Sequence, residues 1–539
     1  MSRAVWDAVG ARMLALPKAT HRYRTIEDEP IPMRDGVELL ADVLLPLGAS
    51  KGTVLFRSPY GWPPLISGLT ASMYARQGYT VVLARCRGTF GSGGRLEPLV
   101  NEAADGADTV AWLRRQPWFT GTFATAGGSY LGCTQLAILL DPPPELVTSV
   151  IQCTAFDLGR HIHRDGAFAL DTWFGWTLAV LRQESGFVRS SMVALRARKH
   201  DARLERTLPL EKGEAEAFGT RAPWYREWIS RRDPDDLYWT GYDLSASLER
   251  IQVPVLFQVG WQDVFLDQGV EAVDRLQKRG AEVAMTAGPW THKSAPLEGG
   301  FTVNEALQWL DQHFVPSVEQ RSSPVRVFVG GAEEWIGLSS WPPVSAEFVL
   351  HPHPMGALLA VPAIEGARAG FTYRPDDPTP SIGGPLNNPN AGYVEDSALA
   401  AREDVLTFTG EPLDKPVRII GSPRLELSQK LSNPHADVFA RLSTVDRDGR
   451  SHNVTEGFIR LDPDAASGAL VLTLDPTAHE FRTGERIRLF LAGGSFPRWE
   501  RNLGTGKDPA TSADLAPSAR IVDLRQSRLV LPVVAAAQL

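Results

Sequence analysis

The sequence predicts an α/β fold: a mostly parallel sheet with helices on both faces, interrupted by a helical insert and followed by a β-sandwich or jelly-roll domain. Three observations predict it. Short apolar strands alternate with helical stretches up to about Phe156 and again from Pro254, as is typical of parallel sheets. The stretch between them is helical and rich in aromatic residues. Beyond Pro324 strand patterns continue, whereas helical patterns nearly vanish.

The first part of the chain, residues 1–155, begins with a predicted hairpin. Arg34, Asp35 and Gly36 form a turn signal, and apolar residues alternate from Val37 to Leu45. Strand and helix patterns then follow one another as expected for a parallel sheet. Strands are predicted at 53–56, 80–84, 122–126 and 146–152, and helices at 103–114 and 130–140.

The predicted insert spans residues 156–245 and interrupts this sheet. Because α/β sheets bind ligands at the carboxyl ends of their strands, we expect the insert to lie over that end. The sheet resumes at 246–318, with strands at 255–259 and 283–286 and a helix at 304–314. The aromatic residues of the insert include Trp173, Phe174, Trp176, Trp224, Trp228 and Trp239.

A polar linker with proline at both ends is predicted at 316–324, and a different kind of domain follows at 325–539. Its short strands are separated by turns rich in Gly, Pro and Asp, which is typical of an antiparallel β-sandwich or jelly roll. The strands are predicted at 325–329, 346–350, 417–421, 436–442, 469–474 and 486–491.

Length and composition exclude several classes of protein. A chain of 539 residues is too long for one hydrophobic core, and its net charge of −8 lies in no long run of one sign, which argues against a nucleic-acid partner. Cys86, Cys133 and Cys153 have no metal-ligand spacing and are expected to be buried thiols in a reducing compartment. Residues 5–16 carry an amphipathic helical stripe and no signal-peptide pattern. With no apolar stretch long enough to span a membrane, the protein is expected to be cytoplasmic, with no membrane partner.

The strongest signal for chemistry is the segment from Gly127 to Gly132, which follows a strand and opens a helix. A sharp turn of this kind holds a nucleophilic serine in a strained conformation and needs small neighbours, which Gly127 and Gly128 provide for Ser129. The common pattern is G-x-S-x-G. Here Leu131 occupies the place of the second glycine, and Gly132 comes one residue later. The competing interpretation is a glycine-rich turn with a chance serine.

A nucleophilic serine needs a general base and an acid that orients the base. In folds with this turn, the acid and then the histidine follow the serine along the chain. Asp263 comes just after the strand at 255–259, and His292 just after the strand at 283–286. We therefore predict Ser129 as nucleophile, His292 as general base and Asp263 as the orienting acid.

The other histidines fit the role of base less well. His161 and His163 form an H-x-H pair, but no third ligand stands at metal spacing. His351, His435 and His452 lie in the β-rich part, far from the serine in sequence. We expect neither a metal ion nor a cofactor.

At these motifs the chain resembles the cocaine esterase-like (CocE/NonD) hydrolases, relatives of the X-Pro dipeptidyl-peptidases and the α-amino acid ester hydrolases. The family's serine motif G-x-S-Y-x-G matches residues 127–132, its acid motif G-W-x-D matches 260–263, and its base motif G-P-W-x-H matches 288–292. The resemblance covers nearly the whole chain. It implies an α/β-hydrolase core with a helical cap insert and a C-terminal jelly-roll β-sandwich.

The resemblance also implies an oxyanion hole and an acyl pocket. The family's Pro-Tyr segment matches Tyr60, whose hydroxyl would stabilise the alkoxide together with the backbone N–H of Tyr130. An aromatic residue near the acyl group would be Phe265, and Trp173 and Trp176 are candidates for the opposite wall. The competing interpretations make Tyr60 a packing ring and both tryptophans part of the cap core.

The chain departs from the family's pattern in two places. Cys86 stands where members usually carry an aspartate. Val264, Phe265 and Leu266 follow Asp263, where relatives that need a free α-amino group place carboxylates. The second departure favours apolar acyl esters or amides as substrates.

The leading hypothesis is a serine hydrolase that cleaves carboxylic ester bonds of small molecules through an acyl-enzyme, with amide bonds as a second option. The alternative is an X-Pro dipeptidyl-peptidase type of peptidase. A third reading, from another class, is a carbohydrate-binding protein with a vestigial hydrolase scaffold, and the intact set of three residues argues against it. The sequence leaves open the natural substrate and whether copies assemble as a homo-oligomer. The anion needed by a dipeptidyl-peptidase would come from Asp157, Asp165, Asp171 or Glu184.

Overall fold

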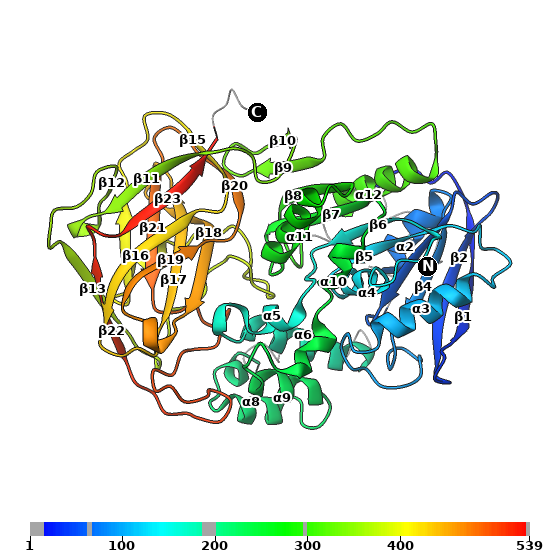
Figure 1. Cartoon of the computed structure of the whole chain (residues 1–539), viewed down its shortest axis with the longest axis horizontal. Helices are drawn as coiled ribbons and strands as arrows, with labels where there is room; N and C mark the ends of the chain where they lie inside the picture. Colours follow the sequence, from blue (N-terminus) through cyan, green and yellow to red (C-terminus); the bar gives the residue numbers. More distant parts are fainter. Residues whose placement is uncertain (1–15, 62–66, 186–200, 295–298, 535–539) are drawn as a thin grey trace.

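The computed structural model describes residues 16–61, 67–185, 201–294 and 299–534. These residues form three parts. An α/β part lies on one side and an all-β part on the other, with the helices of the insert packed below and between them (Figure 1). The stripe predicted at residues 5–16 lies outside the described residues, apart from Leu16. None of the described helices is long and apolar enough to cross a membrane.

The α/β part is built on one mixed sheet of ten strands in the order β1-β2-β4-β3-β5-β6-β7-β8-β9-β10. Strands β3 to β9 are parallel, whereas β1, β2 and β10 pair antiparallel with their neighbours. Every residue of β3 and of β7 is buried, because helices cover both faces. The predicted hairpin, strands and helices are confirmed. Their bounds are β1 Tyr23–Pro32, β2 Glu38–Pro46, β3 Thr53–Ser58, β4 Thr80–Arg85, β5 Phe123–Gly128, β6 Leu146–Gln152, β7 Val255–Gln262 and β8 Val283–Thr291, with helices α2 Ser67–Arg76, α3 Glu102–Leu113, α4 Tyr130–Ile138, α11 Leu266–Lys278 and α12 Gly299–Phe314.

The insert between β6 and β7 is helical, as predicted, and its core is aromatic. Trp173 packs edge-on against Trp228, with ring centroids 5.2 Å apart, and Phe174 packs against Phe218. The cap helices are α5 Leu158–Ile162, α6 Leu170–Arg182, α8 Leu210–Ala217, α9 Pro223–Ser230 and α10 Ala246–Arg250.

The H-x-H pair lies at the end of α5, with His161 in the helix and His163 directly after it. His161 Nε2 lies 2.9 Å from the carbonyl oxygen of Val264, and His163 Nε2 lies 2.6 Å from that of Trp228. A carbonyl can only accept, so each ring carries its hydrogen on Nε2. Within the described ranges, no group of three or more His, Cys, Asp or Glu side chains could hold a metal ion.

Three buried histidines should make the fold less stable in acid, whereas Glu205, whose pKa burial raises to about 8, offsets part of this effect. Burial lowers the pKa of His161 to about 3, of His163 to about 4 and of His479 to about 3, from an ordinary 6.5. Below pH 6.5 these histidines bind protons in the unfolded chain but not in the folded chain. The stability that the folded chain gains from neutral histidines is therefore complete above pH 6.5 and is lost as the pH falls. At pH 5 each of these histidines lowers the free energy of unfolding by about 2 kcal/mol relative to neutral pH.

We expect the Tm to fall steadily between pH 7 and pH 5 in scanning fluorimetry. A His163→Gln variant keeps a donor but cannot titrate in this range, so its Tm should fall less steeply. A wild-type Tm that is flat or rises towards pH 5 would contradict the prediction.

The C-terminal part is all-β, with antiparallel pairing throughout its strand ladders. A nine-stranded sheet and a four-stranded sheet (β14-β21-β17-β18) enclose a separate apolar core. The strands are β11 Ala346–Pro352, β12 Leu358–Leu359, β13 Arg368–Tyr373, β14 Val405–Thr409, β15 Val417–Gly421, β16 Arg424–Leu431, β17 Asp437–Val445, β18 Ser451–Arg460, β19 Gly468–Thr473, β20 Thr477–Phe481, β21 Arg486–Ala492, β22 Ser518–Asp523 and β23 Arg528–Val533.

Two strands that follow the predicted domain start at residue 325 still extend the core sheet. The strand expected there, β9 (Val325–Val329), pairs parallel with β8, and β10 (Glu334–Leu338) closes the same sheet. The new sheets begin only at β11. A short strand with alternating burial has the same pattern in either sheet, so its sequence does not reveal its partner.

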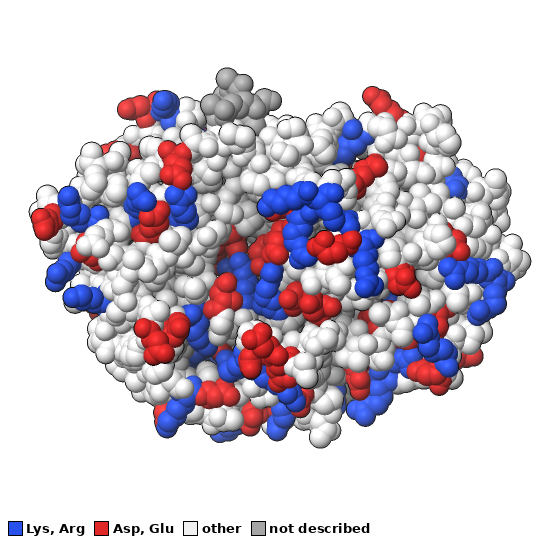
Figure 2. Space-filling view, viewed as in Figure 1, with Lys and Arg blue, Asp and Glu red and all other residues white. Residues whose placement is uncertain are grey.

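Charges of both signs are interspersed on the face in Figure 2, and many gather in a hollow between the two parts. The lining of this groove includes Arg164, Asp165 and Asp267 beside Asp475 of the all-β part. Arg164 pairs with Asp475, which ties the cap to that part.

Candidate active site

Ser129 lies at the tip of the turn between β5 and α4. Its backbone has φ 58° and ψ −126°, a conformation that costs a non-glycine residue about 1–3 kcal/mol. The turn is crowded: a Cβ on Gly127, which has φ 134°, would lie 2.6 Å from Leu131 Cβ. Glycine at 127 is therefore what allows the chain to present Ser129 in this way.

Packing explains why the second glycine of the serine motif is Gly132, one residue later than in the common pattern. A Cβ on Gly132 would lie 2.5 Å from Cβ of Thr154, in the segment after β6. Thr154 Oγ1 in turn donates a hydrogen bond of 2.8 Å to the carbonyl oxygen of Ser129. Glycine is needed one residue later than in the common pattern because α4 approaches this segment at Gly132.

The three residues predicted as a triad lie in one chain of hydrogen bonds. His292 Nε2 is 2.9 Å from Ser129 Oγ, and His292 Nδ1 is 2.8 Å from Asp263 Oδ2. The Asp263 side chain is fully buried, and its Oδ1 accepts a bond of 2.7 Å from the backbone N–H of Phe265. A carboxylate accepts, so Nδ1 carries the ring hydrogen and the lone pair of Nε2 faces the serine hydroxyl.

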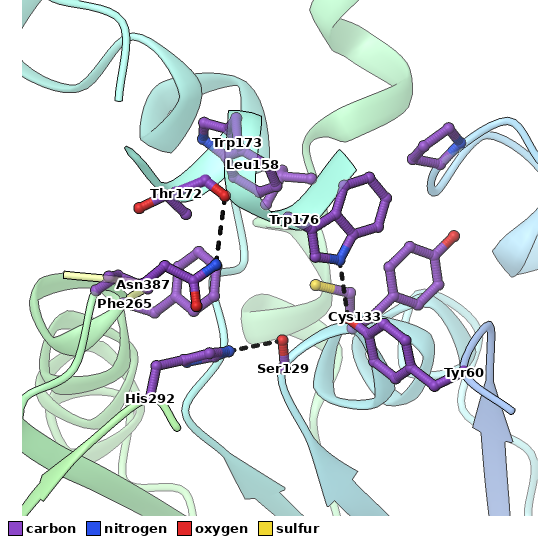
Figure 3. A pocket seen from close by; sticks show the side chains of 13 residues that line it. Tyr60, Ser129, Cys133, Leu158, Thr172, Trp173, Trp176, Phe265, His292 and Asn387 are labelled. Atoms are coloured by element: carbon purple, nitrogen blue, oxygen red, sulfur yellow. Dashed lines mark hydrogen bonds between the residues drawn. The ribbon is translucent and has the colours of Figure 1, made fainter. Parts of the chain in front are cut away.

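Tyr60 stands on the other side of Ser129, as Figure 3 shows. The indole N–H of Trp176 donates a 2.9 Å hydrogen bond to the Tyr60 hydroxyl oxygen, which leaves the tyrosine proton free to point elsewhere. Burial raises the pKa of Tyr60 to about 12, so the hydroxyl stays protonated at neutral pH. The backbone N–H of Tyr130 opens α4, where the partial positive charge of a helix N-terminus favours a developing anion.

A buried polar network, which the sequence did not reveal, fixes the start of α4. The Tyr130 hydroxyl donates to Glu102 Oε1 at 2.9 Å and accepts from the backbone N–H of Leu99 at 2.9 Å. Arg57 donates to Glu102 Oε2 at 2.7 Å. Cys86 lies beside this network, and burial together with Glu102 raises the pKa of its thiol.

The reactive groups lie at the floor of a narrow cavity of about 30 Å³. Phe265 forms one wall, with its ring centroid 5.2 Å from that of His292, and Trp173 and Trp176 of α6 lie above (Figure 3). All three predicted substrate-binding residues thus line the cavity. The tryptophans also pack in the cap core, against each other and against Trp228. Sequence reasoning missed the other lining residues: Pro98, Cys133, Leu158, Thr172, Val264 and Asn387.

The chain is similar to known hydrolases along most of its length. Residues 35–294 match the family model of the X-Pro dipeptidyl-peptidase (S15 family), and residues 316–530 match that of the X-Pro dipeptidyl-peptidase C-terminal non-catalytic domain. The cocaine esterase of Rhodococcus sp. (strain MB1 Bresler) is 26% identical over an alignment that covers 90% of this chain and 93% of that protein. The chain belongs to the CocE/NonD-like serine hydrolases.

Solved structures share the fold of this CocE/NonD-like chain from end to end. An α-amino acid ester hydrolase superposes with a TM-score of 0.80 at 21% identity, covering 96% of this chain and 98% of that one. An aminopeptidase from the marine sediment archaeon Thaumarchaeota archaeon gives 0.80 at 22% identity, with the same coverages. The core, the cap and the all-β part are therefore common to all three proteins.

Proposed function

We propose that this protein hydrolyses carboxylic esters of small molecules through an acyl-enzyme, with Ser129 as nucleophile, His292 as general base and Asp263 as the orienting acid. The observation that carries the proposal is the hydrogen-bonded series Asp263–His292–Ser129, at 2.8 Å and 2.9 Å, at the floor of a cavity lined mainly by apolar side chains. An acyl group fits such walls without an ionic partner.

In the acylation step, His292 Nε2 takes the proton of Ser129 as Oγ attacks the substrate carbonyl carbon. The carbonyl oxygen becomes an alkoxide, which the Tyr60 hydroxyl and the Tyr130 N–H stabilise. Asp263 holds the imidazole in the required tautomer and stabilises its positive charge. His292 then gives the proton to the departing alcohol, and the carbon–oxygen bond breaks. Water attacks the acyl-enzyme by the same route and frees Ser129.

The X-Pro dipeptidyl-peptidase alternative has less support, although the matching family models carry that name. It needs an anion near the reactive groups for the substrate's ammonium, and none of the four predicted carboxylates lines the described cavity. Each of them has another partner: Asp157 accepts from the N–H of Arg160, Asp165 pairs with Arg164, Asp171 accepts from the N–H of Asn387, and Glu184 accepts from the N–H of Phe90.

A substrate panel tests the proposal. We expect kcat/KM for p-nitrophenyl acyl esters, acetate through octanoate and benzoate, to exceed that for Ala-Pro-p-nitroanilide by at least about 100-fold, because a buried ammonium without an ionic partner costs several kcal/mol. Preference for the dipeptide anilide would favour the peptidase. Binding of oligosaccharides with no hydrolysis of any substrate would favour the carbohydrate-binding alternative.

Phe265 should set the size of acyl group that the cavity accepts. We expect Phe265→Ala to shift the optimum in the same ester series towards longer or bulkier acyl groups. Each additional buried CH₂ contributes about 0.8 kcal/mol, or roughly fourfold in kcat/KM, so the series is a sensitive measure. Tyr238→Ala, in an aromatic cluster of the cap outside the cavity lining, is the control. Parallel profiles of wild type and Phe265→Ala would show that this ring does not shape the acyl site.

A further inference from the structure

One side chain of the catalytic cavity comes from the all-β part. Asn387 lies in the long connection between β13 and β14, more than 200 residues from the cap helix that it meets, yet it lines the same cavity as Ser129 and His292. Figure 3 shows its amide group above His292 and in front of Phe265. No sequence motif marks this position.

A buried carboxyl group fixes the backbone at this point. Asp171, in the first turn of α6, is only 3% exposed. Its Oδ2 accepts a 2.5 Å hydrogen bond from the backbone N–H of Asn387, and its Oδ1 accepts a 2.6 Å bond from Asn388 Nδ2. The N–H of Asp171 donates to the carbonyl oxygen of Pro497. Two segments of the all-β part are thus held against α6. These buried hydrogen bonds fix the position of the Asn387 backbone.

The orientation of the Asn387 amide follows from its own hydrogen bond. Nδ2 lies 3.3 Å from the backbone carbonyl oxygen of Thr172. A carbonyl oxygen can only accept, so the nitrogen faces Thr172 and the amide oxygen points the other way, towards the floor with His292 and Ser129 (Figure 3). Among the described residues, none donates a hydrogen bond to Asn387 Oδ1.

Asn387 is half-buried, and an acceptor that no protein donor occupies can serve a substrate donor that enters the cavity. A hydrogen bond made there contributes about 0.5–1.5 kcal/mol. His292 protonates the leaving group, so the leaving atom must lie on the His292 side, where Oδ1 also lies. The leaving oxygen of an ester carries no hydrogen. The leaving nitrogen of a secondary amide carries one.

Amide cleavage makes a specific demand at this point. When Ser129 Oγ bonds to the carbonyl carbon, the nitrogen becomes pyramidal, and its lone pair must face His292 to receive the proton before the C–N bond breaks. The N–H hydrogen must then point elsewhere. An acceptor beside His292 holds the nitrogen in that arrangement without taking a proton itself.

We propose that Asn387 Oδ1 accepts the hydrogen bond of the scissile N–H, and that this residue extends the enzyme from esters to secondary amides with apolar acyl groups. The inference rests on the proposed function and deepens it, because it assigns a substrate class to the same cavity. Asn387 is then a specificity-determining residue supplied by the all-β part.

A matched pair of substrates isolates this hydrogen bond. Butyryl-p-nitroanilide has the N–H, whereas p-nitrophenyl butyrate has the same acyl group and an ether-like oxygen instead. We expect wild type to hydrolyse both. In Asn387→Leu, which is close in volume but has no acceptor, the ratio of anilide to ester kcat/KM should fall about 10-fold, the value of one hydrogen bond of about 1.4 kcal/mol.

Asn388→Ala is the control, because Asn388 bonds to Asp171 from the same loop and does not line the cavity. It should keep the wild-type ratio, even if both rates change. An unchanged ratio in Asn387→Leu would overturn the inference, as would a wild-type enzyme that cleaves the ester and not the anilide. Hydrolysis of neither substrate would overturn the proposed function itself. The rate of fluorophosphonate labelling in each variant verifies that Ser129 and His292 are still assembled.

Discussion

Replacing Ser129 with alanine should lower kcat at least about 10³-fold while the protein stays folded. The three residues of the proposed triad act as a unit, so loss of the nucleophile removes nearly all of their joint effect. Alanine is smaller than serine and fits the crowded turn between Gly127 and Leu131. The measurements are kcat with p-nitrophenyl butyrate, covalent labelling by a fluorophosphonate detected by intact mass, and the Tm.

The cavity provides its own control for this result. Cys133 lines the same cavity, and its sulfur is also a potential nucleophile. Burial raises the pKa of its thiol to about 11, so it stays protonated and unreactive at neutral pH. Cys133→Ala should therefore keep the fluorophosphonate label that Ser129→Ala loses. A label that persists in Ser129→Ala would mean that another residue is the nucleophile.

Replacing Tyr60 with phenylalanine should lower kcat by about 10²–10³-fold with little change in KM. A hydroxyl that stabilises only the alkoxide contributes to the transition state and not to substrate binding. Phenylalanine keeps the edge-on packing against the Tyr130 ring, whose centroid lies 6.4 Å away, so the change isolates the hydroxyl. Steady-state kinetics on one ester measures both constants.

Trp176→Phe separates donation by Tyr60 from its packing. This variant keeps an aromatic wall but removes the N–H that occupies the tyrosine oxygen. We expect a loss in kcat smaller than that of Tyr60→Phe, because the hydroxyl remains but is less firmly oriented. If Tyr60→Phe raised KM and left kcat unchanged, Tyr60 would be a substrate-packing residue and not an oxyanion donor.

Most of the α/β core could be predicted from the sequence, because its strands are continuous apolar runs and its motifs have local causes. The crowding around Gly127 is set by residues within the same turn, and Asp263 and His292 come directly after strands whose carboxyl ends meet at one edge. Such short-range features leave a pattern in the sequence.

Contacts between distant segments left no such pattern. Asp171 binds the loop that carries Asn387 to the cavity, and neither residue belongs to a motif. The hydrogen bond from Trp176 that orients Tyr60 links the cap to a loop after β3. The partner of β9 was likewise invisible, because its alternation suits either sheet. These features depend on which surfaces meet after folding.

The placement of β9 and β10 determines where relatives can be recombined. Gly330, just after β9, donates to the carbonyl oxygen of Ala478 and accepts from the N–H of Glu480, so main-chain bonds pass from the core sheet to β20. A chimaera of two relatives joined at the proline-flanked linker would take β8 from one parent and β9 and β10 from the other. Strand β8 would then pair with a strand from a different protein. The crossover point that keeps each sheet within one parent lies between β10 and β11, in residues 339–345.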